Sequence, residues 1–301
     1  MNSMAAEIAV EAADGHRWSL PLRAPEQPRA RLLWLPALGV GARHYLPFAE
    51  ALAALGIAVH VHEWRGNGSS SLRPSRGKDW GYRELLAQDL PASLAALAAD
   101  ADRTPLLIGG HSLGGQLACC FAGQHPDAFA GLWLVATGTP WWRSFPRPGR
   151  WLLPLAYRFL PWLARRQGAL HGRRVGFGGT EARSLIADWA RVGLTNRYAA
   201  AGLPCDLEAG MARLRLPAAG IVLADDWLAP RSSLQALLHK LPQADASIVE
   251  LDARALGAPA DHFSWMKQPA CLARALADAF FASQAAGTVD GTSRLPHNLA
   301  P

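Results

Sequence analysis

One serine lies in a setting that could make it a nucleophile. Ser112 is the centre of Gly110-His111-Ser112-Leu113-Gly114, a Gly-x-Ser-x-Gly pentapeptide. An apolar run precedes it at residues 105–108, and an Ala/Leu/Cys stretch follows it to residue 123. This order predicts a strand, a sharp turn at positive φ and a helix, with glycines that let strand and helix pass closely. The turn would present the hydroxyl above a sheet, with the amides of the helix start directed at the group it attacks.

A serine hydroxyl becomes an effective nucleophile when a base, itself oriented by a carboxylate, lies within reach. On sheet folds these partners follow the serine in the order Asp or Glu, then His, in loops after later strands. The predicted strand at residues 218–224 leads into Asp225 and Asp226. The predicted strand at residues 247–251 leads into a loop that carries His262. Both partners therefore occur where such an architecture requires them.

Together these motifs resemble those of the α/β-hydrolase superfamily, specifically its serine-dependent branch with an inserted lid. The resemblance covers residues 6–281 apart from the lid. It includes Arg-Gly-Asn-Gly-Ser at residues 65–69, which is similar to the family's Arg-Gly-x-Gly-x-Ser loop and is interpreted as structural. The resemblance implies an α/β-hydrolase fold, a mostly parallel sheet flanked by helices.

The resemblance also assigns roles to individual residues. It implies that Ser112 is the nucleophile, that His262 is the general base, and that an aspartate orients the His262 ring. The family's Asp-x-x-x-Pro pattern fits Asp226, because Pro230 follows it by four residues. Asp226 rather than Asp225 is therefore expected to be the acid.

For the oxyanion hole, the resemblance implies the backbone amides of Leu38 and Leu113. Leu113 directly follows Ser112. Leu38 belongs to Pro-Ala-Leu-Gly at residues 36–39, which stands where many family members carry His-Gly. The missing His-Gly is the main departure from the family pattern, and it concerns the assignment of the Leu38 amide to the oxyanion hole.

The chemistry that this resemblance implies is hydrolysis of a carboxylic ester or thioester through an acyl-enzyme intermediate on Ser112. No metal and no organic cofactor is expected. An acyltransferase is one alternative, because it would use the same three residues and differ in what enters the pocket. A ligand-binding protein on the same fold is the non-enzymatic alternative, although such proteins tend to lose members of the triad.

Half of the 301 residues are hydrophobic, which suffices for a substantial core. Apolar runs alternate with helical stretches, so a parallel sheet covered on both faces is predicted. Residues 1–137 and 217–285 are expected to form the core, residues 138–216 an inserted helical lid, and residues 286–301 a disordered tail. The expected elements are a hairpin at 6–22, strands at 31–35, 57–62, 105–108, 131–136, 218–224 and 247–251, and helices at 45–55, 89–99, 232–241 and 271–285.

The predicted lid is rich in aromatic residues. Large aromatic side chains stabilise a cap that has little sheet support, and some of them can line an acyl pocket. The candidate pocket residues are Trp141 and Trp142 at the start of the lid, and His44, Tyr45 and His111 beside the predicted active site. Simple packing is the alternative interpretation, and for His111 it is the favoured one.

Basic charge is confined to the predicted lid. Between Asp127 and Glu181 there are eight arginines and no acidic residue. The rest of the chain carries 22 basic and 24 acidic residues, so its charge is nearly balanced. This distribution indicates a local anion-facing surface and not a nucleic-acid-binding protein. A neutral or anionic small-molecule ester or thioester is the expected substrate, because an aminopeptidase would favour carboxylates facing the pocket. Peripheral contact of the lid with a membrane is the less favoured alternative.

Residues 1–14 lack the basic start and apolar run of a secretory signal, and no stretch reaches the roughly 20 apolar residues of a membrane span. Four cysteines without metal-ligand spacing are expected to be buried thiols in a reducing compartment. His60 and His62 alternate on one predicted strand and are interpreted as structural groups. A cytoplasmic protein is the resulting expectation.

Overall fold

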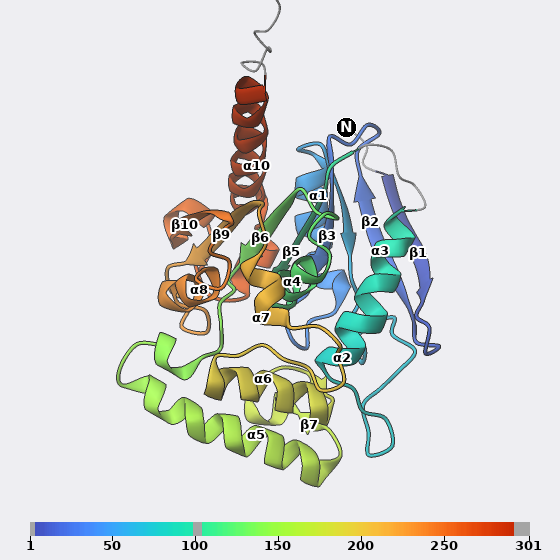
Figure 1. Ribbon diagram of the computed structural model, residues 1–301, viewed down its shortest axis with the longest axis vertical. Helices are drawn as coiled ribbons and strands as arrows, with labels where there is room; N and C mark the ends of the chain where they lie inside the picture. Colours follow the sequence, from blue (N-terminus) through green and yellow to red (C-terminus); the bar gives the residue numbers. More distant parts are fainter. Residues whose placement is uncertain (1–3, 99–103, 292–301) are drawn as a thin grey trace, which may run out of the picture.

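The computed structural model describes residues 4–98 and 104–291. Eight of the strands in these ranges form one sheet (Figure 1). The strands are β1 Met4–Glu11, β2 Arg17–Ala24, β3 Ala30–Leu35, β4 Ile57–Val61, β5 Leu106–His111, β6 Gly131–Val135, β9 Pro217–Leu223 and β10 Asp245–Leu251. Their order is β1-β2-β4-β3-β5-β6-β9-β10. β2 pairs antiparallel with β1 and β4, and the other neighbours pair in parallel. The predicted α/β-hydrolase fold is confirmed.

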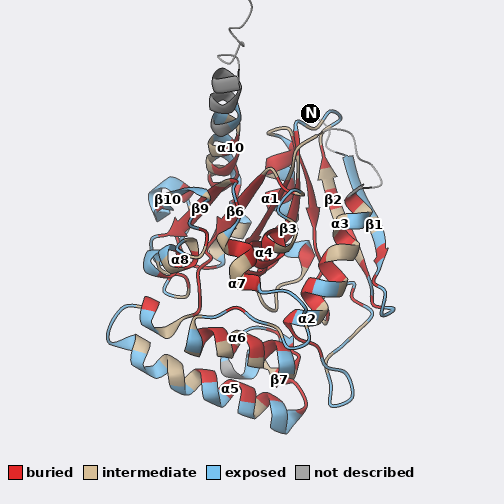
Figure 2. Ribbon diagram, viewed as in Figure 1, coloured by how far each residue is buried: buried red, intermediate tan, exposed pale blue. Residues whose placement is uncertain are grey.

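Helices cover both faces of the sheet and create two apolar cores (Figures 1 and 2). α1 (Leu46–Ala53) and α10 (Ala270–Gly291) pack on one face. The other face is covered by α3 (Leu90–Ala98), α4 (Leu113–Gln124) and α8 (Arg231–Leu238). All residues of β4 and β6 are buried, and apart from His60 in β4 both strands are apolar throughout, as strands covered on both faces tend to be. By contrast, β2 near the edge alternates in burial.

The helix predicted to begin at Asp89 begins earlier in the chain. α2 (Tyr82–Glu84) runs into a π-helical turn at Leu85–Asp89, which α3 continues. Asp89 is buried inside this helix, and its carboxylate accepts two hydrogen bonds of 2.7 Å from the Arg65 guanidinium. An Asp-Leu-Pro stretch is typical of a helix start, but here the wide π-helical turn precedes Pro91, which has no N–H to donate.

The last helix is also longer than predicted. The sequence predicts a disordered tail from residue 286, but α10 continues to Gly291. Alanines at 285 and 286 favour continued helix, and Gly287 alone does not end it. The rest of the predicted tail, 292–301, and the predicted end of α3 at residue 99 lie outside the described residues. In the described ranges, no helix has the length and apolarity needed to cross a membrane.

The four cysteines are free thiols in two different settings. Cys119 and Cys120 are buried in α4 as predicted. The prediction was wrong for Cys205, which is exposed, and Cys271 is half-buried. Cys205 lies in the loop before α7 (Leu207–Ala212), where its sulfur accepts a hydrogen bond from Gln124 Nε2 at 3.1 Å.

Residues 138–216, between β6 and β9, form a helical insertion that we call the inserted segment. In Figure 1 its helices α5 (Leu153–Gln167) and α6 (Arg183–Thr195) lie together below the sheet. A two-residue ladder of β7 (Leu170–His171) and β8 (Thr180–Glu181) joins them. α5 packs against α6, whereas α7 packs on α4 of the core. The inserted segment is therefore anchored to the core at its end.

Candidate active site

Ser112 forms the sharp turn between β5 and α4. Its φ of 55° and ψ of −120° are sparsely populated for a residue with a side chain and store about 1–3 kcal/mol of strain. A Cβ on Gly110 would lie 2.4 Å from the carbonyl carbon of Gly114, and a Cβ on Gly114 would lie 2.0 Å from Leu35 O. Only glycine fits at either position, as the sequence pattern predicts.

Asp226 and His262 are joined near the carboxyl ends of β9 and β10. His262 Nδ1 donates to Asp226 Oδ2 at 2.7 Å, and both side chains are buried. The other oxygen of Asp226 accepts from the amides of Leu228 and Ala229 at 2.9 and 3.1 Å. The neighbouring Asp225 is exposed. Because Nδ1 carries the proton toward Asp226, the Nε2 atom of neutral His262 is a proton acceptor.

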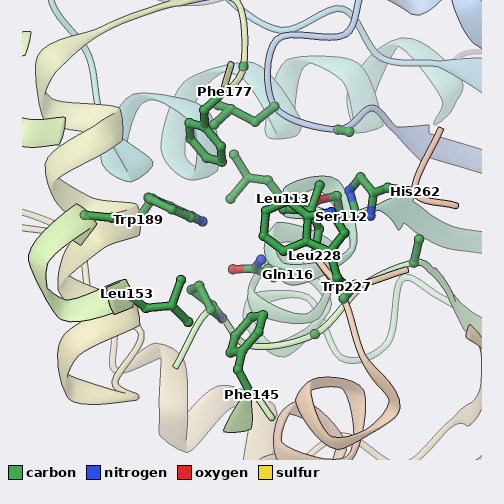
Figure 3. Close-up of a pocket in the computed structure, with 18 of the residues that line it drawn as sticks. Ser112, Leu113, Gln116, Phe145, Leu153, Phe177, Trp189, Trp227, Leu228 and His262 are labelled. Atoms are coloured by element: carbon green, nitrogen blue, oxygen red, sulfur yellow. The ribbon is translucent and has the colours of Figure 1, made fainter. Parts of the chain in front are cut away.

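Ser112 and His262 line the same cavity, which has a volume of about 370 Å³. This volume is in the range of small-molecule sites. Figure 3 shows the opposite wall, where Trp189 and Leu153 face the cavity from α6 and α5. That wall is built mainly from large side chains of the inserted segment, namely Phe145, Leu153, Tyr157, Leu160, Phe177 and Trp189.

Leu38 and Leu113 also line the cavity, and Leu113 directly follows Ser112. Leu38 lies in the loop after β3, and hydrogen bonds fix that loop just before it. Trp64 Nε1 donates to Pro36 O at 2.8 Å, and the Ala37 amide donates to Tyr45 Oη at 2.9 Å. The loop then turns at Gly39, whose φ is 73°. The Leu38 backbone is thus held in place without the His-Gly pair that many relatives carry.

Tyr45 and His111 form a buried hydrogen-bonded pair behind this loop. Tyr45 Oη accepts from Ala37, so its own proton goes to His111 Nδ1 at 2.8 Å. His111 therefore carries its proton on Nε2. Burial lowers the pKa of His111 well below its usual range, and the nearby His262 adds to this effect. The neutral pair connects the end of β5, just before Ser112, to the loop that holds Leu38.

None of the five candidate pocket residues from the sequence lines the cavity. Tyr45 and His111 are buried, His44 is exposed, and Trp141 and Trp142 are half-buried. Nearness to the site in the sequence does not fix which way a side chain points. Trp142, for example, packs against another tryptophan of the inserted segment, with 5.2 Å between the ring centroids. The packing alternative fits Tyr45 and His111, which are buried.

Gln116 is a cavity residue that the sequence analysis missed. It lies four residues after Ser112 on α4, so both side chains occupy one face of the helix start. Tyr198 Oη donates to Gln116 Oε1 at 3.1 Å and orients the carboxamide. Trp227 and Phe263 were also missed, and both line the cavity while remaining exposed to solvent. Helical spacing from Ser112 could have indicated Gln116.

Charged side chains are absent from the cavity wall as far as the described residues show. The eight arginines between Asp127 and Glu181 lie elsewhere. Within the described ranges no cluster of His, Cys, Asp and Glu could hold a metal ion. His62 is buried, and its Nδ1 bonds to Ser93 Oγ at 2.9 Å. Burial lowers the pKa of His62 to about 3, which suits a neutral structural group.

The model of one protein family, described as serine aminopeptidase, S33, matches residues 26–253. No curated protein sequence matches the chain. Three solved structures are similar to the fold at 17–20% identity. They are the esterase domain of a Rhodothermus marinus protein (20% identity, TM-score 0.58, covering 91% of this chain and 97% of that chain), Est1E from Butyrivibrio proteoclasticus with bound ferulic acid (17%, 0.60, 93% and 99%) and the thioesterase domain from the curacin biosynthetic pathway (18%, 0.56, 92% and 99%).

Proposed function

Because the chain belongs to the serine aminopeptidase (S33) family of α/β-hydrolases, we propose that it is a serine hydrolase that cleaves a carboxylic ester or thioester. The single observation that carries this proposal is the Asp226–His262 hydrogen bond of 2.7 Å at the wall of the cavity into which the elbow presents Ser112. A base that is oriented by a buried carboxylate beside a serine at positive φ is the arrangement that nucleophilic acyl transfer requires.

In the proposed mechanism, His262 Nε2 takes the proton of Ser112 Oγ as that oxygen attacks the acyl carbon. The tetrahedral intermediate then collapses, and His262 gives the proton to the departing alcohol or thiol. Water attacks the resulting acyl-enzyme with His262 again as base, and the carboxylic acid is released. Asp226 holds the imidazole and stabilises its cation throughout.

We assign the oxyanion hole to the backbone amides of Leu38 and Leu113. Support comes from the presence of both residues in the wall of the cavity that Ser112 lines, and from the bonds that fix the loop before Leu38. Each such donor is worth about 3 kcal/mol of transition-state stabilisation. We also assign the role of lid to the inserted segment, since its side chains form the wall opposite Ser112.

The name of the family raises a second candidate, an aminopeptidase. Binding of a cationic amine in a low-dielectric cavity favours a carboxylate partner. Among the described lining residues there is no carboxylate, and the wall from the inserted segment is apolar. This wall favours a neutral acyl group. An anionic part of the substrate would lie outside the cavity, because the arginines that could pair with it are not among the lining residues.

Labelling with a fluorophosphonate probe tests the proposal. The wild-type chain should be labelled, and Ser112→Ala should not be. Asp226→Asn should lower kcat for p-nitrophenyl esters by about 10³–10⁴-fold, because the His262 ring would lose its orienting acceptor. Asp225→Asn is the matched control, since that neighbouring aspartate is exposed, and it should retain activity. An unlabelled wild type, or equal losses in the two variants, would refute the assignment.

Substrate panels separate the alternatives. Graded p-nitrophenyl esters and acyl thioesters should be turned over in preference to aminoacyl p-nitroanilides, and the reverse preference would establish the aminopeptidase. An acyltransferase would instead give ester products when an alcohol acceptor is added. A chain that binds these esters without turnover would be a ligand-binding protein.

A further inference from the structure

The outer side of α5, together with the 3-10 turn before it, exposes a row of large apolar side chains. We call this row the outer stripe, and it consists of Trp151, Leu152, Leu155, Phe159 and Trp162. Each is between 47 and 68% exposed. Trp151 and Leu152 lie in the 3-10 turn Gly149–Leu152, which leads into α5. The later members follow at spacings of three or four residues, which keeps them on one face of α5, and the whole row is roughly 17 Å long at the usual helical rise. Figure 2 shows α5 at the edge of the molecule, with exposed residues along it.

α5 is apolar on its inner side as well. Leu153, Tyr157 and Leu160 line the cavity, so this helix separates the cavity from the outer stripe. The inner side chains explain how α5 binds to the rest of the protein, but nothing in the described chain covers the outer ones. A contiguous exposed apolar face on a helix marks a contact site, because isolated soluble proteins rarely leave one open to water.

Positive charge surrounds the outer stripe. None of the eight arginines between Asp127 and Glu181 makes an ion pair with a carboxylate of the described residues. Two of them lie over tryptophans of the stripe, Arg150 over Trp151 at 4.9 Å and Arg166 over Trp162 at 5.6 Å. Arg158 and Arg165 on α5 are exposed. The surface therefore combines exposed aromatic rings with unneutralised cations.

This charge decides between the occupants that an apolar stripe could have. A second copy of the chain would meet the stripe through a symmetric interface, which would bring the same arginines face to face. A partner must therefore supply negative charge together with apolar volume. An anionic lipid bilayer supplies both, and a basic amphipathic helix with Trp, Phe and Leu on its apolar face is suited to lie in the headgroup region.

We propose that the outer stripe docks the protein on the surface of an anionic membrane. The five apolar side chains enter the boundary between headgroups and acyl chains, and the arginines contact lipid phosphates. α5 then lies in the membrane surface with the cavity on its other side. Docking of this kind depends on the surface of α5 and not on Ser112, so it is independent of the proposed catalysis.

Vesicle co-sedimentation tests the docking directly. The full-length chain is mixed with vesicles of phosphatidylcholine, either pure or containing phosphatidylglycerol, at low and high salt. Binding should be strong with phosphatidylglycerol, weaker with phosphatidylcholine alone, and reduced by salt. Ser112→Ala should bind as the wild type does. Equal binding to both vesicle types would overturn the anionic assignment, and binding to neither would overturn the proposal.

Two double variants locate the surface. Leu155→Gln with Phe159→Gln removes apolar side chains but keeps good helix formers, and binding should weaken at least tenfold. Arg165→Gln with Arg166→Gln should weaken binding to phosphatidylglycerol vesicles by about 30-fold and leave binding to phosphatidylcholine unchanged.

Matched controls carry the same chemistry elsewhere on the surface. Met4→Gln with Val249→Gln removes two exposed apolar side chains, and Arg254→Gln with Arg274→Gln removes two exposed arginines. Both pairs should leave vesicle binding within about twofold of wild type, and a loss equal to that of the α5 variants would overturn the assigned surface. Circular dichroism and labelling by the fluorophosphonate probe verify that each variant is folded.

Size-exclusion chromatography over a range of concentrations tests the second copy as occupant. The wild-type chain and the variant with Leu155→Gln and Phe159→Gln should elute at the same volume at every concentration. If Leu155→Gln with Phe159→Gln converted a dimer into a monomer, the stripe would be an interface between copies and the membrane proposal would be wrong.

Discussion

Tyr45 shows how one hydroxyl can affect an active site that it does not line. It accepts from the Ala37 amide and donates to His111 Nδ1, so it satisfies two buried groups at once. Ala37 directly precedes Leu38, whose amide we assign to the oxyanion hole. Tyr45 is therefore a positioning residue, acting through the loop rather than on the substrate.

Tyr45→Phe should lower kcat about tenfold with little change in KM. The Leu38 amide would still be present, but the loop that carries it would be held less accurately. It should also lower the free energy of unfolding by about 1–3 kcal/mol, since two buried polar groups lose their partner. Steady-state kinetics and urea denaturation measure the two effects. Tyr82→Phe is the matched control, because the Tyr82 hydroxyl is buried and has no hydrogen-bond partner among the described residues. Equal effects in both variants would contradict the positioning role.

At the scale of elements, the contact between β8 and the loop after β3 brings the inserted segment against the assigned oxyanion hole. A Cβ on Gly39 would lie 2.1 Å from Gly179 N and 2.8 Å from Glu181 Oε1. The Gly179 amide donates to the same Glu181 oxygen at 2.8 Å. Burial raises the pKa of Glu181 to about 7. A carboxyl that ionises near neutral pH thus lies where the two elements meet.

The raised pKa predicts a stability change with a definite sign. The folded chain keeps the Glu181 proton up to about pH 7, whereas the unfolded chain releases it near pH 4.5, the ordinary pKa of a glutamate. The stabilising contribution is therefore complete below about pH 4.5 and is lost as pH rises to about 7, a change on the order of 3 kcal/mol. Glu181→Gln keeps an acceptor for the Gly179 amide and should remove this part of the pH dependence.

Urea denaturation from pH 4 to 8 measures this contribution as the difference between wild type and Glu181→Gln. The variant should gain relative stability as pH rises through that window. Glu7→Gln, at an exposed position on β1, serves as the control and should give a flat difference. A flat difference for Glu181→Gln as well would show that its carboxyl is not perturbed in the folded protein.

At the scale of the whole molecule, one buried ionic network joins parts that are distant in the sequence. Asp89, in the helix on one face of the sheet, accepts from Arg65 after β4 and from His16 Nδ1 at 3.0 Å in the hairpin. Arg65 also pairs with Asp14 at 2.7 Å. The arginine of the Arg-Gly-x-Gly-x-Ser loop is therefore structural, in agreement with the sequence interpretation.

Asp89→Asn should cost about 3–5 kcal/mol of unfolding free energy, because the buried Arg65 cation would lose its main counterion. Glu250→Gln breaks the exposed Arg231–Glu250 pair and should cost no more than about 1 kcal/mol. Thermal and urea unfolding of both variants give the comparison. Similar small losses in the two would mean that Asp14 alone suffices to compensate Arg65.

The strands of the sheet and the loops at their carboxyl ends could be predicted from the residues alone. Local patterns carry this information, because apolar runs mark buried strands, and Gly-x-Ser-x-Gly dictates a turn at Ser112 that only close-packed glycines permit. The spacing to Pro230 selected Asp226 over Asp225, and the structure shows Asp226 hydrogen-bonded to His262. The pentapeptide and the Asp226–Pro230 spacing each involve only a few neighbouring residues, so they can be recognised without knowledge of the fold.

The directions in which side chains point became visible in the folded chain and not before. It placed Tyr45 and His111 behind the cavity, Gln116 on its wall, and Asp89 inside a helix against Arg65. It also divided the aromatic residues of the inserted segment between the cavity, as for Trp189, and the outer stripe. The physical reason is that composition fixes how much apolar surface a segment carries. The packing of α5 on α6 fixes which of the apolar side chains are buried.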